Sequence, residues 1–302
     1  MEPDWMALPL EDYREILIDV AVRSGLYEAL NREVNDCGDE PWIKNPIATR
    51  ILDALGEVGL VKTDHHGYHW IGEEPDPRVL QRWGQVRSWL ELTEHLSPWF
   101  HGKDIWTIDL DQERLQMSAA SLSHWLGHQI RPQAGSSWLD IGAGTGVWAK
   151  ELLRWGAKVV IAEKPEVMAR IPHVPGVQRW SGDIFQSMPH GLFDGVTLIR
   201  FIEDFSPEQI ESLFVRIAPR LKPRGRVYVV GYFRDRCPLG ALFDVHVLSN
   251  TGRGRCYSVN ELDSMALSSG FAVESEMVDT QNYYVAVELA LRQNMNGVKE
   301  HR

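Results

Sequence analysis

The decapeptide at residues 137–146, Ser-Trp-Leu-Asp-Ile-Gly-Ala-Gly-Thr-Gly, constrains the fold of this chain more than any other segment. An apolar run ends around Asp140, three glycines follow at alternate positions, and an apolar pattern with helical spacing begins at Val147. Glycine has no Cβ and tolerates positive φ, so such a turn brings backbone close to a ligand. The helix start adds free N–H groups that can bind polar ligand atoms. The segment therefore predicts a strand, a ligand-binding turn and a helix.

Later segments continue the alternation of strands and helices. The apolar run at residues 159–162 ends in Glu163, about 20 residues after the glycine turn, where an acid can accept hydrogen bonds from ribose hydroxyls. A third strand is expected to end at Ser181-Gly182-Asp183-Ile184, and a buried fourth strand is expected at residues 193–199. Residues 221–230 are expected to hold a helix exit that leads into a fifth strand. A hairpin at residues 271–276 and 283–290 completes the predicted sheet.

In this order, the motifs resemble those of the class I S-adenosylmethionine (SAM)-dependent methyltransferases. More narrowly, they resemble the O-methyltransferase family of plant phenolic and bacterial natural-product enzymes, most strongly from Ser137 to Phe271. The resemblance implies an α/β fold class. A Rossmann-like SAM-binding domain, with a mostly parallel sheet and an antiparallel last strand, is expected over residues 106–302. A mainly helical, winged-helix-like dimerisation domain is expected over residues 1–105.

The resemblance also implies which residues bind the cofactor SAM. In the family, the glycine loop carries the methionine part, the acid after the second strand holds the ribose, and the next segment covers the adenine. A basic residue is common after the fourth strand in bacterial members. The implied residues are Asp140, Gly142, Gly144, Glu163, Asp183, Ile184 and Arg200. NAD is the alternative ligand, and the G-x-G-x-G spacing and the second acid after the third strand both weaken it.

The catalytic positions depart from the family pattern. A His-Asp-Trp segment after the fourth strand supplies the family's base, and Glu203-Asp204-Phe205 stands there in this chain. The family's two flanking acids fall at Gly231 and, if Gly254 and the capping box at residues 258–261 are kept in register, at Cys256. All three positions of the family's catalytic set therefore differ, which leaves the chemistry of the acceptor open.

Glu203 admits several interpretations. A free glutamate, with a pKa of about 4.3, is a poor base for a phenol with a pKa near about 10. Burial can raise a carboxyl pKa by up to roughly 3–5 units. Alternatively, the carboxylate binds a cationic acceptor, orients a carbon acid, or lies on the surface at a helix entry. Asp204 and His246, the latter in a helix expected to face the pocket, complete the candidate catalytic set. No diagnostic ligand spacing is present, so no metal is predicted.

Aromatic residues predict the acceptor pocket. All 12 tryptophans precede residue 181, and aromatic walls suit a flat, apolar or cationic ligand. The resemblance places Trp99, Phe100, Trp106 and Trp125 where the family builds this pocket, together with Met117 before the SAM-binding core. Cys256 is the remaining candidate for the pocket, so the predicted substrate residues are Trp99, Trp106, Met117 and Cys256.

The N-terminal third suggests a winged helix, which raises DNA binding as a function. A helix is expected over residues 11–30, ended or bent early at Gly25, and another over residues 46–58, followed by a hairpin. Residues 1–100 hold 9 Lys or Arg and 19 Asp or Glu, a net charge of −10. A DNA-facing domain needs cations to replace phosphate counterions, so the charge argues against a DNA-binding regulator.

Composition limits the remaining partners. The net charge of the 302-residue chain is −11, which argues against nucleic acid and anionic membranes. No apolar run of about 18 residues exists, and residues 1–30 lack a signal-peptide pattern. We predict a cytoplasmic, homodimeric SAM-dependent methyltransferase acting on a small, natural-product-like molecule. O-Methylation is favoured by the family; the alternatives are N- or C-methylation, or an enzyme of the same fold that binds SAM without methyl transfer.

Overall fold

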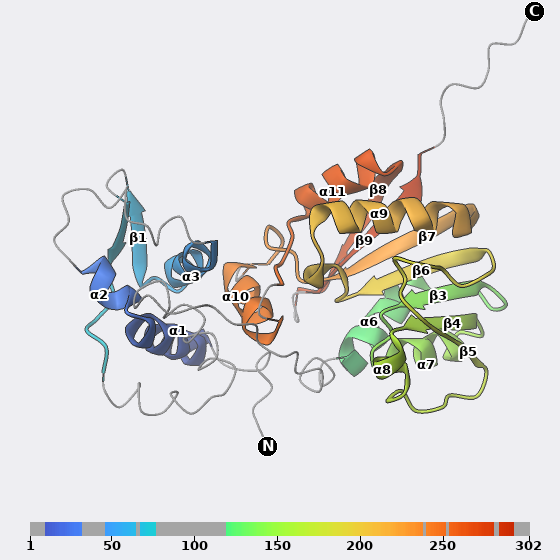
Figure 1. Cartoon of the computed structure of the whole chain (residues 1–302), viewed down its shortest axis with the longest axis horizontal. Coiled ribbons are helices and arrows are strands. Elements are labelled where there is room, and N and C mark those ends of the chain that lie inside the picture. The colour runs from blue at the N-terminus through green and yellow to red at the C-terminus, as the bar shows by residue number, and fades with distance from the viewer. Residues whose placement is uncertain are drawn as a thin grey trace, which may run out of the picture. The chain divides into compact units, whose positions relative to one another are not determined.

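The computed structural model describes residues 10–31, 46–64, 67–76, 119–237, 240–251, 254–280 and 284–292. The chain divides into two compact units, drawn in Figure 1. The first unit consists of Met1–Arg114 and Cys237–Cys256, and the second of Leu115–Arg236 and Tyr257–Arg302. We predicted one boundary, between residues 105 and 106. The observed division differs, because the later segment Cys237–Cys256 belongs to the first unit.

The described part of the first unit is a set of helices with one hairpin. Glycine at position 25 has a φ of 83° and separates the first two helices, as its place in the sequence predicted. A helix followed by an antiparallel hairpin was also predicted and is confirmed. The elements are α1 (Leu10–Ser24), α2 (Leu26–Leu30), α3 (Pro46–Glu57), β1 (Val61–Asp64), β2 (Gly67–Trp70) and α10 (Gly240–Thr251).

Helix α10 was predicted to belong to the SAM-binding domain, and contacts with α3 explain its place in the first unit instead. The Glu57 carboxylate accepts hydrogen bonds from the N–H groups of Ala241, at 2.9 Å, and Leu242, at 3.1 Å. It thereby satisfies two of the otherwise free donors at the start of α10. Four apolar residues of α10 lie in the core of the first unit: Ala241, Leu242, Val245 and Leu248.

The second unit is built on a seven-stranded sheet with the order β5-β4-β3-β6-β7-β9-β8. The first five strands in this order pair in parallel, while β9 is antiparallel to both of its neighbours. The predicted fold class is therefore found. The strands are β3 (Ser137–Ile141), β4 (Lys158–Glu163), β5 (Val177–Ser181), β6 (Phe193–Ile199), β7 (Leu221–Gly231), β8 (Phe271–Val278) and β9 (Val285–Leu291).

Helices cover both faces of this sheet (Figure 1). The chain runs outward from the β3–β6 pair in two opposite directions, and right-handed crossovers place the helices of the two directions on opposite faces. Both predicted capping boxes, Ser206 with Gln209 and Ser258 with Glu261, are formed. The helices are α6 (Ala119–Ile130), α7 (Val147–Arg154), α8 (Pro165–Met168), α9 (Pro207–Ile217) and α11 (Val259–Ser268).

The parallel strands bring their carboxyl ends to one edge of the sheet, which is where open α/β sheets bind ligands. The order of the strands places β3 and β6 side by side at the centre, so the chain reverses its winding there.

Among the described residues, no helix has both the length and the apolar character needed to cross a membrane.

Candidate functional site

The predicted glycine turn lies at the carboxyl end of β3. Gly142, Gly144 and Gly146 have φ values of 72°, 55° and 73°, which only glycine adopts readily. The turn ends where α7 begins, at Val147. A Cβ on Gly142 would overlap the ring of Phe201, so this glycine serves both the backbone conformation and the close approach of an aromatic side chain.

Asp140 is buried beside this turn. Its Oδ1 accepts a hydrogen bond of 2.8 Å from the Thr197 hydroxyl, which itself accepts one from Trp148 Nε1 at 3.1 Å. Its Oδ2 is buried without a partner among the described residues. Burial raises the pKa of Asp140 to about 7, the Thr197 hydrogen bond opposes the rise, and nearby Glu163 adds to it. A ligand with a positive charge or an N–H donor would favour the charged carboxylate.

Glu163 ends β4 and reaches back to the glycine turn. Its Oε1 accepts the N–H of Gly144 at 2.9 Å, and its Oε2 accepts the N–H of Lys164 at 3.0 Å. Burial raises its pKa, and these two hydrogen bonds oppose the rise. The parallel pairing of β3 with β4 thus brings together two acids that are 23 positions apart in the sequence.

A pocket that is partly open to solvent follows the turn. It contains three of the predicted cofactor residues of the turn, Asp140, Gly142 and Gly144, and also Arg200. The structure adds Leu122 and Ser123 of α6, which the sequence did not single out, because only the tertiary fold brings that helix to the end of β3.

The segment predicted to cover the adenine follows β5. Ile184 is buried, whereas Asp183 is exposed and its Oδ1 accepts the N–H of Phe185 at 2.9 Å, which stabilises a local turn. Phe185 and Phe201 each pack against Phe205, with ring centroids 5.0 and 4.8 Å apart. This row of three rings connects the segment to the glycine turn, and the sequence singled out neither Phe185 nor Phe201.

Arg200, predicted as a cofactor residue, lies at the end of β6 beside two tyrosines. Its backbone has a φ of 47°, and its N–H donates to the Val230 carbonyl at 2.7 Å. Its guanidinium lies over the rings of Tyr232 and Tyr284, at 5.6 and 5.5 Å, and Nη2 donates to the Tyr284 hydroxyl at 3.3 Å. The two rings are 5.2 Å apart. Cation–π contacts of this kind orient a guanidinium.

The two tyrosines could not be found from sequence spacing, because they lie 52 positions apart. The antiparallel register pairs Gly231 with Val285, which places Tyr232 and Tyr284 opposite one another beyond the strand ends. The ring of Trp125, from α6, lies 6.3 Å from Tyr284. Trp125 is therefore the tryptophan of the predicted acceptor pocket that the structure places near Arg200.

Glu203 lies in a 3₁₀ turn, η5 (Ile202–Asp204), directly after β6. It is only 9% exposed, and its Oε2 is buried without a partner among the described residues. Burial raises its pKa to about 7, with half-buried Asp204 adding to the rise and Arg200 opposing it. The interpretation of Glu203 as a surface residue at a helix entry was therefore wrong. The Glu203 carboxyl lies against Gly231, the last residue of β7, which shows that the turn packs on the end of that strand.

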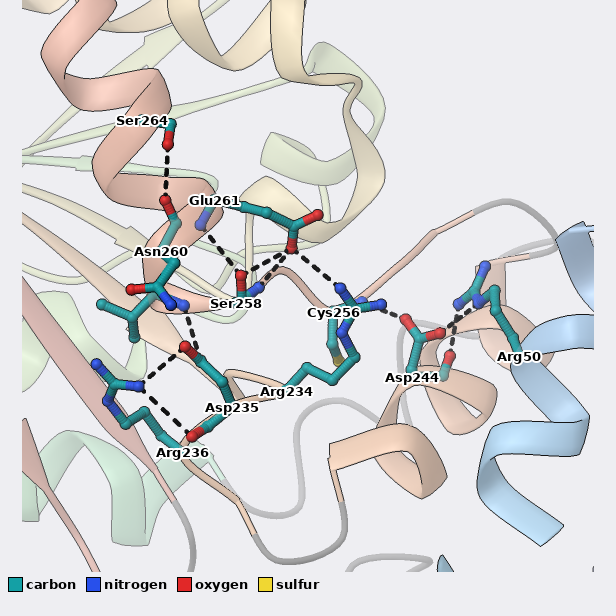
Figure 2. A network of polar contacts seen from close by, with 11 residues as sticks. Arg50, Arg234, Asp235, Arg236, Asp244, Cys256, Ser258, Asn260, Glu261 and Ser264 are labelled. Carbon is teal, nitrogen blue, oxygen red and sulfur yellow. Dashed lines mark hydrogen bonds and ion pairs between the residues drawn. The ribbon is translucent and has the colours of Figure 1, made fainter. Parts of the chain in front are cut away.

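Two further candidates lie in the first unit. The backbone of His246 is part of α10, and its side chain lies outside the described residues. Cys256 is buried, and its N–H donates to Asp244 Oδ1 at 2.7 Å. Arg50 holds the same acid through its Nε and donates to the Asp244 and Gly254 carbonyls at 2.7 Å each, as Figure 2 shows for Arg50, Asp244 and Cys256. These contacts indicate that the Cys256 backbone helps to hold Asp244 and Arg50 in place.

The remaining polar contacts of Figure 2 belong to the second unit and fix the start of α11. Glu261 accepts hydrogen bonds from the Ser258 N–H at 2.8 Å and from Arg234 at 3.2 Å, while Asp235 accepts the Val259 N–H at 2.8 Å. The predicted substrate residues Trp99, Trp106 and Met117 lie outside the described residues. In the part of the chain that is described, no three His, Cys, Asp or Glu residues gather as metal ligands.

Comparison with known proteins places this geometry in a family. Residues 112–276 match a family model described as a methyltransferase domain, which is more than half of the chain. A flavonoid 3'-O-methyltransferase of Chrysosplenium americanum is 26% identical over 148 residues, which are 46% of this chain and 43% of that protein. A probable inactive methyltransferase of Oryza sativa is 26% identical over 162 residues, covering 50% of this chain and 42% of that protein. The chain thus spans under half the length of these relatives.

A solved structure with a similar fold is the O-methyltransferase family 2 protein of Planctomyces limnophilus, crystallised in complex with apigenin. It is 16% identical, covers 93% of both chains and has a TM-score of 0.66. At this identity the likeness concerns the fold alone.

Proposed function

Because the chain belongs to the methyltransferase domain family, we propose that it transfers a methyl group from SAM to an acidic hydroxyl of a small aromatic molecule. The membership confirms the predicted family, the fold class and SAM as the cofactor. The predicted homodimer, cytoplasmic location and natural-product pathway stay predictions.

The cofactor half of the site supports this proposal. SAM carries two positive charges, on its ammonium and its sulfonium, and Asp140 offers a buried, unpartnered carboxylate oxygen to the pocket. The glycine turn lets backbone approach a ligand, and Glu163 lies where a ribose-binding acid is expected. These donors and acceptors fit SAM. When bound, SAM supplies an electrophilic methyl group on sulfur.

The single observation that carries the choice of acceptor is the buried carboxyl of Glu203. Its pKa of about 7 is close to neutral pH, which is the range in which a side chain works best as a general base. A phenolic hydroxyl is acidic enough to give its proton to such a base. The hydroxyl proton passes to Glu203 as the oxygen gains the methyl group, and the carboxyl later releases that proton to water.

Arg200 and its tyrosines support an aromatic acceptor. The guanidinium lines the pocket and is oriented by Tyr232 and Tyr284. A fixed positive charge near the acceptor oxygen would stabilise the negative charge that develops as the proton leaves. The relatives named for flavonoids and the Planctomyces protein bound to apigenin agree with a phenolic acceptor.

The test measures transfer directly, because one relative carries the name of a probable inactive methyltransferase. The protein is incubated with methyl-labelled SAM and phenolic acceptors, apigenin first, and label in the product is quantified. Glu203→Gln keeps the shape of the side chain but cannot accept the proton. We expect its kcat to fall about 100-fold or more, with SAM affinity within about twofold of wild type.

Glu208→Gln is the matched control, since it removes an exposed carboxylate five positions further along the same segment. Its kcat should equal that of the wild type. Wild-type turnover in Glu203→Gln would remove Glu203 from the mechanism. SAM binding by the wild type without label in any phenol would instead favour an enzyme of the same fold that does not transfer methyl.

A further inference from the structure

Gly231, the last residue of β7, is a glycine that the backbone does not require. Its φ lies outside the positive range in which eleven other glycines of the described chain are found. It is buried and pairs with Val285 in regular antiparallel register. Any amino acid could adopt this strand conformation, so the reason for a glycine must be the space above its Cα.

That space is occupied by Glu203. A Cβ built on Gly231 would overlap Glu203 Oε1 and would lie 3.6 Å from Glu203 Cδ. Apart from the adjacent residues of the strand, no other heavy atom of the described residues lies within 4 Å of this Cβ. The obstacle is therefore the end of one flexible side chain. A larger residue at position 231 would move the carboxyl rather than the strand.

We propose that Gly231 is a positioning residue, which leaves open the volume that the Glu203 carboxyl occupies. The inference rests on the proposed function of Glu203 as the base. It makes positions 203 and 231 a coupled pair: a long acid at one position requires the absence of a side chain at the other.

The surroundings of the carboxyl supply a measurable consequence. Two charged groups face Glu203: Arg200 at the end of β6 lowers its pKa, and Asp204 within η5 raises it. Burial outweighs both and sets the pKa at about 7. A carboxyl displaced from this volume toward water loses most of the burial contribution, so its pKa should fall toward the ordinary value of about 4.3.

Gly231→Ala is the direct test. The Glu203 pKa is measured in the protein without acceptor, by carbon NMR of labelled glutamate, with Glu203→Gln identifying the signal. We expect that pKa to fall by at least one unit and the acidic limb of the kcat profile to shift with it. Misplacing a catalytic group by about 1 Å can cost about 100-fold, so we expect kcat to fall between about tenfold and about 100-fold. SAM affinity should stay unchanged.

Two variants separate positioning from a general loss of structure. Gly56→Ala adds a Cβ that meets only the Val61 carbonyl, at 3.8 Å, and should change neither the Glu203 pKa nor turnover. In the Gly231→Ala background, Glu203→Asp shortens the acid and should recover part of kcat. If Gly231→Ala does not fold, the double variant with Glu203→Ala, which lacks the obstructing carboxyl, should fold.

The outcomes also separate this inference from the proposed function. An unchanged Glu203 pKa and pH profile in Gly231→Ala would overturn the positioning role, even if the wild type transfers methyl groups. Additive losses from Gly231→Ala and Glu203→Gln would overturn it too, because coupled residues are non-additive. A shifted Glu203 pKa in a protein that methylates no phenol would keep the positioning role and reject the proposed function.

Discussion

The carboxyl edge of the sheet in the second unit has two halves that are built differently. Over β3 and β4, the proposed cofactor half consists of a short glycine turn with Asp140 and Glu163, in which a backbone N–H of the turn bonds the Glu163 carboxylate. Over β6, β7 and β9, the proposed acceptor half consists of side chains: Arg200, Glu203 and the tyrosines at positions 232 and 284. One half is a local motif, and the other is an assembly of distant residues.

The difference between the two halves indicates which positions of such a fold can change its chemistry. A backbone turn with positive φ tolerates few substitutions, so we expect changes in the proposed cofactor half to be costly. Side chains on separate strand ends can change together when one fills the space that the other leaves open, which is the relation we propose for Glu203 and Gly231. If the two halves act separately, variants of the cofactor half should change SAM affinity, and variants of the acceptor half should change the use of the acceptor.

The largest effect is expected from Gly142→Ala. The new Cβ would overlap the Phe201 ring, and the φ of 72° is unfavourable for alanine. The strain and the clash together should lower the stability by about 2–4 kcal/mol. Because relief of the clash moves the turn or Phe201 beside the pocket, we expect SAM affinity to fall as well, by about 30-fold or more. Isothermal calorimetry measures the affinity and thermal unfolding measures the stability.

Gly135→Ala is the control for Gly142→Ala. It has a φ of 83°, and an added Cβ meets nothing within 4 Å, so it carries the backbone strain without a clash. It should lose stability and keep its SAM affinity. Equal affinity losses in the two variants would show that the contact between the glycine turn and Phe201 does not shape the cofactor half.

A smaller effect is expected from Asp140→Asn, which keeps the shape and removes the charge that faces the pocket. We expect SAM affinity to fall about tenfold, or about 1.4 kcal/mol. The pKa of Asp140 is about 7 in the free protein, and only the charged carboxylate attracts a cation. Wild-type affinity should therefore rise with pH through this value, while the affinity of the variant should depend less on pH.

Asp194→Asn provides the comparison for Asp140→Asn, because this acid lies near the opposite end of the sheet, where Lys222 and the Ser137 N–H contact it. Calorimetry at several pH values should show SAM binding like that of the wild type. If the SAM affinity of the wild type does not vary between about pH 5.5 and about pH 8.5, a range around the Asp140 pKa, the Asp140 charge does not contribute to binding.

The smallest effect is expected from Tyr284→Phe, which removes the hydroxyl that accepts a hydrogen bond from Arg200. One such bond contributes about 0.5–1.5 kcal/mol, so the KM for the phenolic acceptor should rise about two- to tenfold. SAM affinity should not change. Tyr228→Phe, in a tyrosine that stacks on Trp138 away from Arg200, is the control. A change in SAM affinity with an unchanged acceptor KM would contradict the division into two halves.

Much of the fold could be predicted from the sequence because its signals are local. Glycine turns, capping boxes and apolar runs act within a few residues, and the strands and the bend at Gly25 were placed correctly. The return of α10 to the first unit was not predicted. Its cause is the contacts of Glu57 and Arg50 with residues more than 180 positions away. The spacing of apolar residues in a sequence does not indicate contacts over such separations.

For the site, the sequence by itself located the glycine turn and the acid at the end of the next strand, because each is marked by a short local pattern. It also identified Glu203 and Gly231 as departures, without relating them. Only the tertiary structure decided that the carboxyl at position 203 lies in the volume left by the glycine at 231, and that Arg200 lies against Tyr232 and Tyr284. The physical reason is that burial and steric exclusion depend on which strand ends are neighbours, and the order of strands in the sheet is a property of the folded chain.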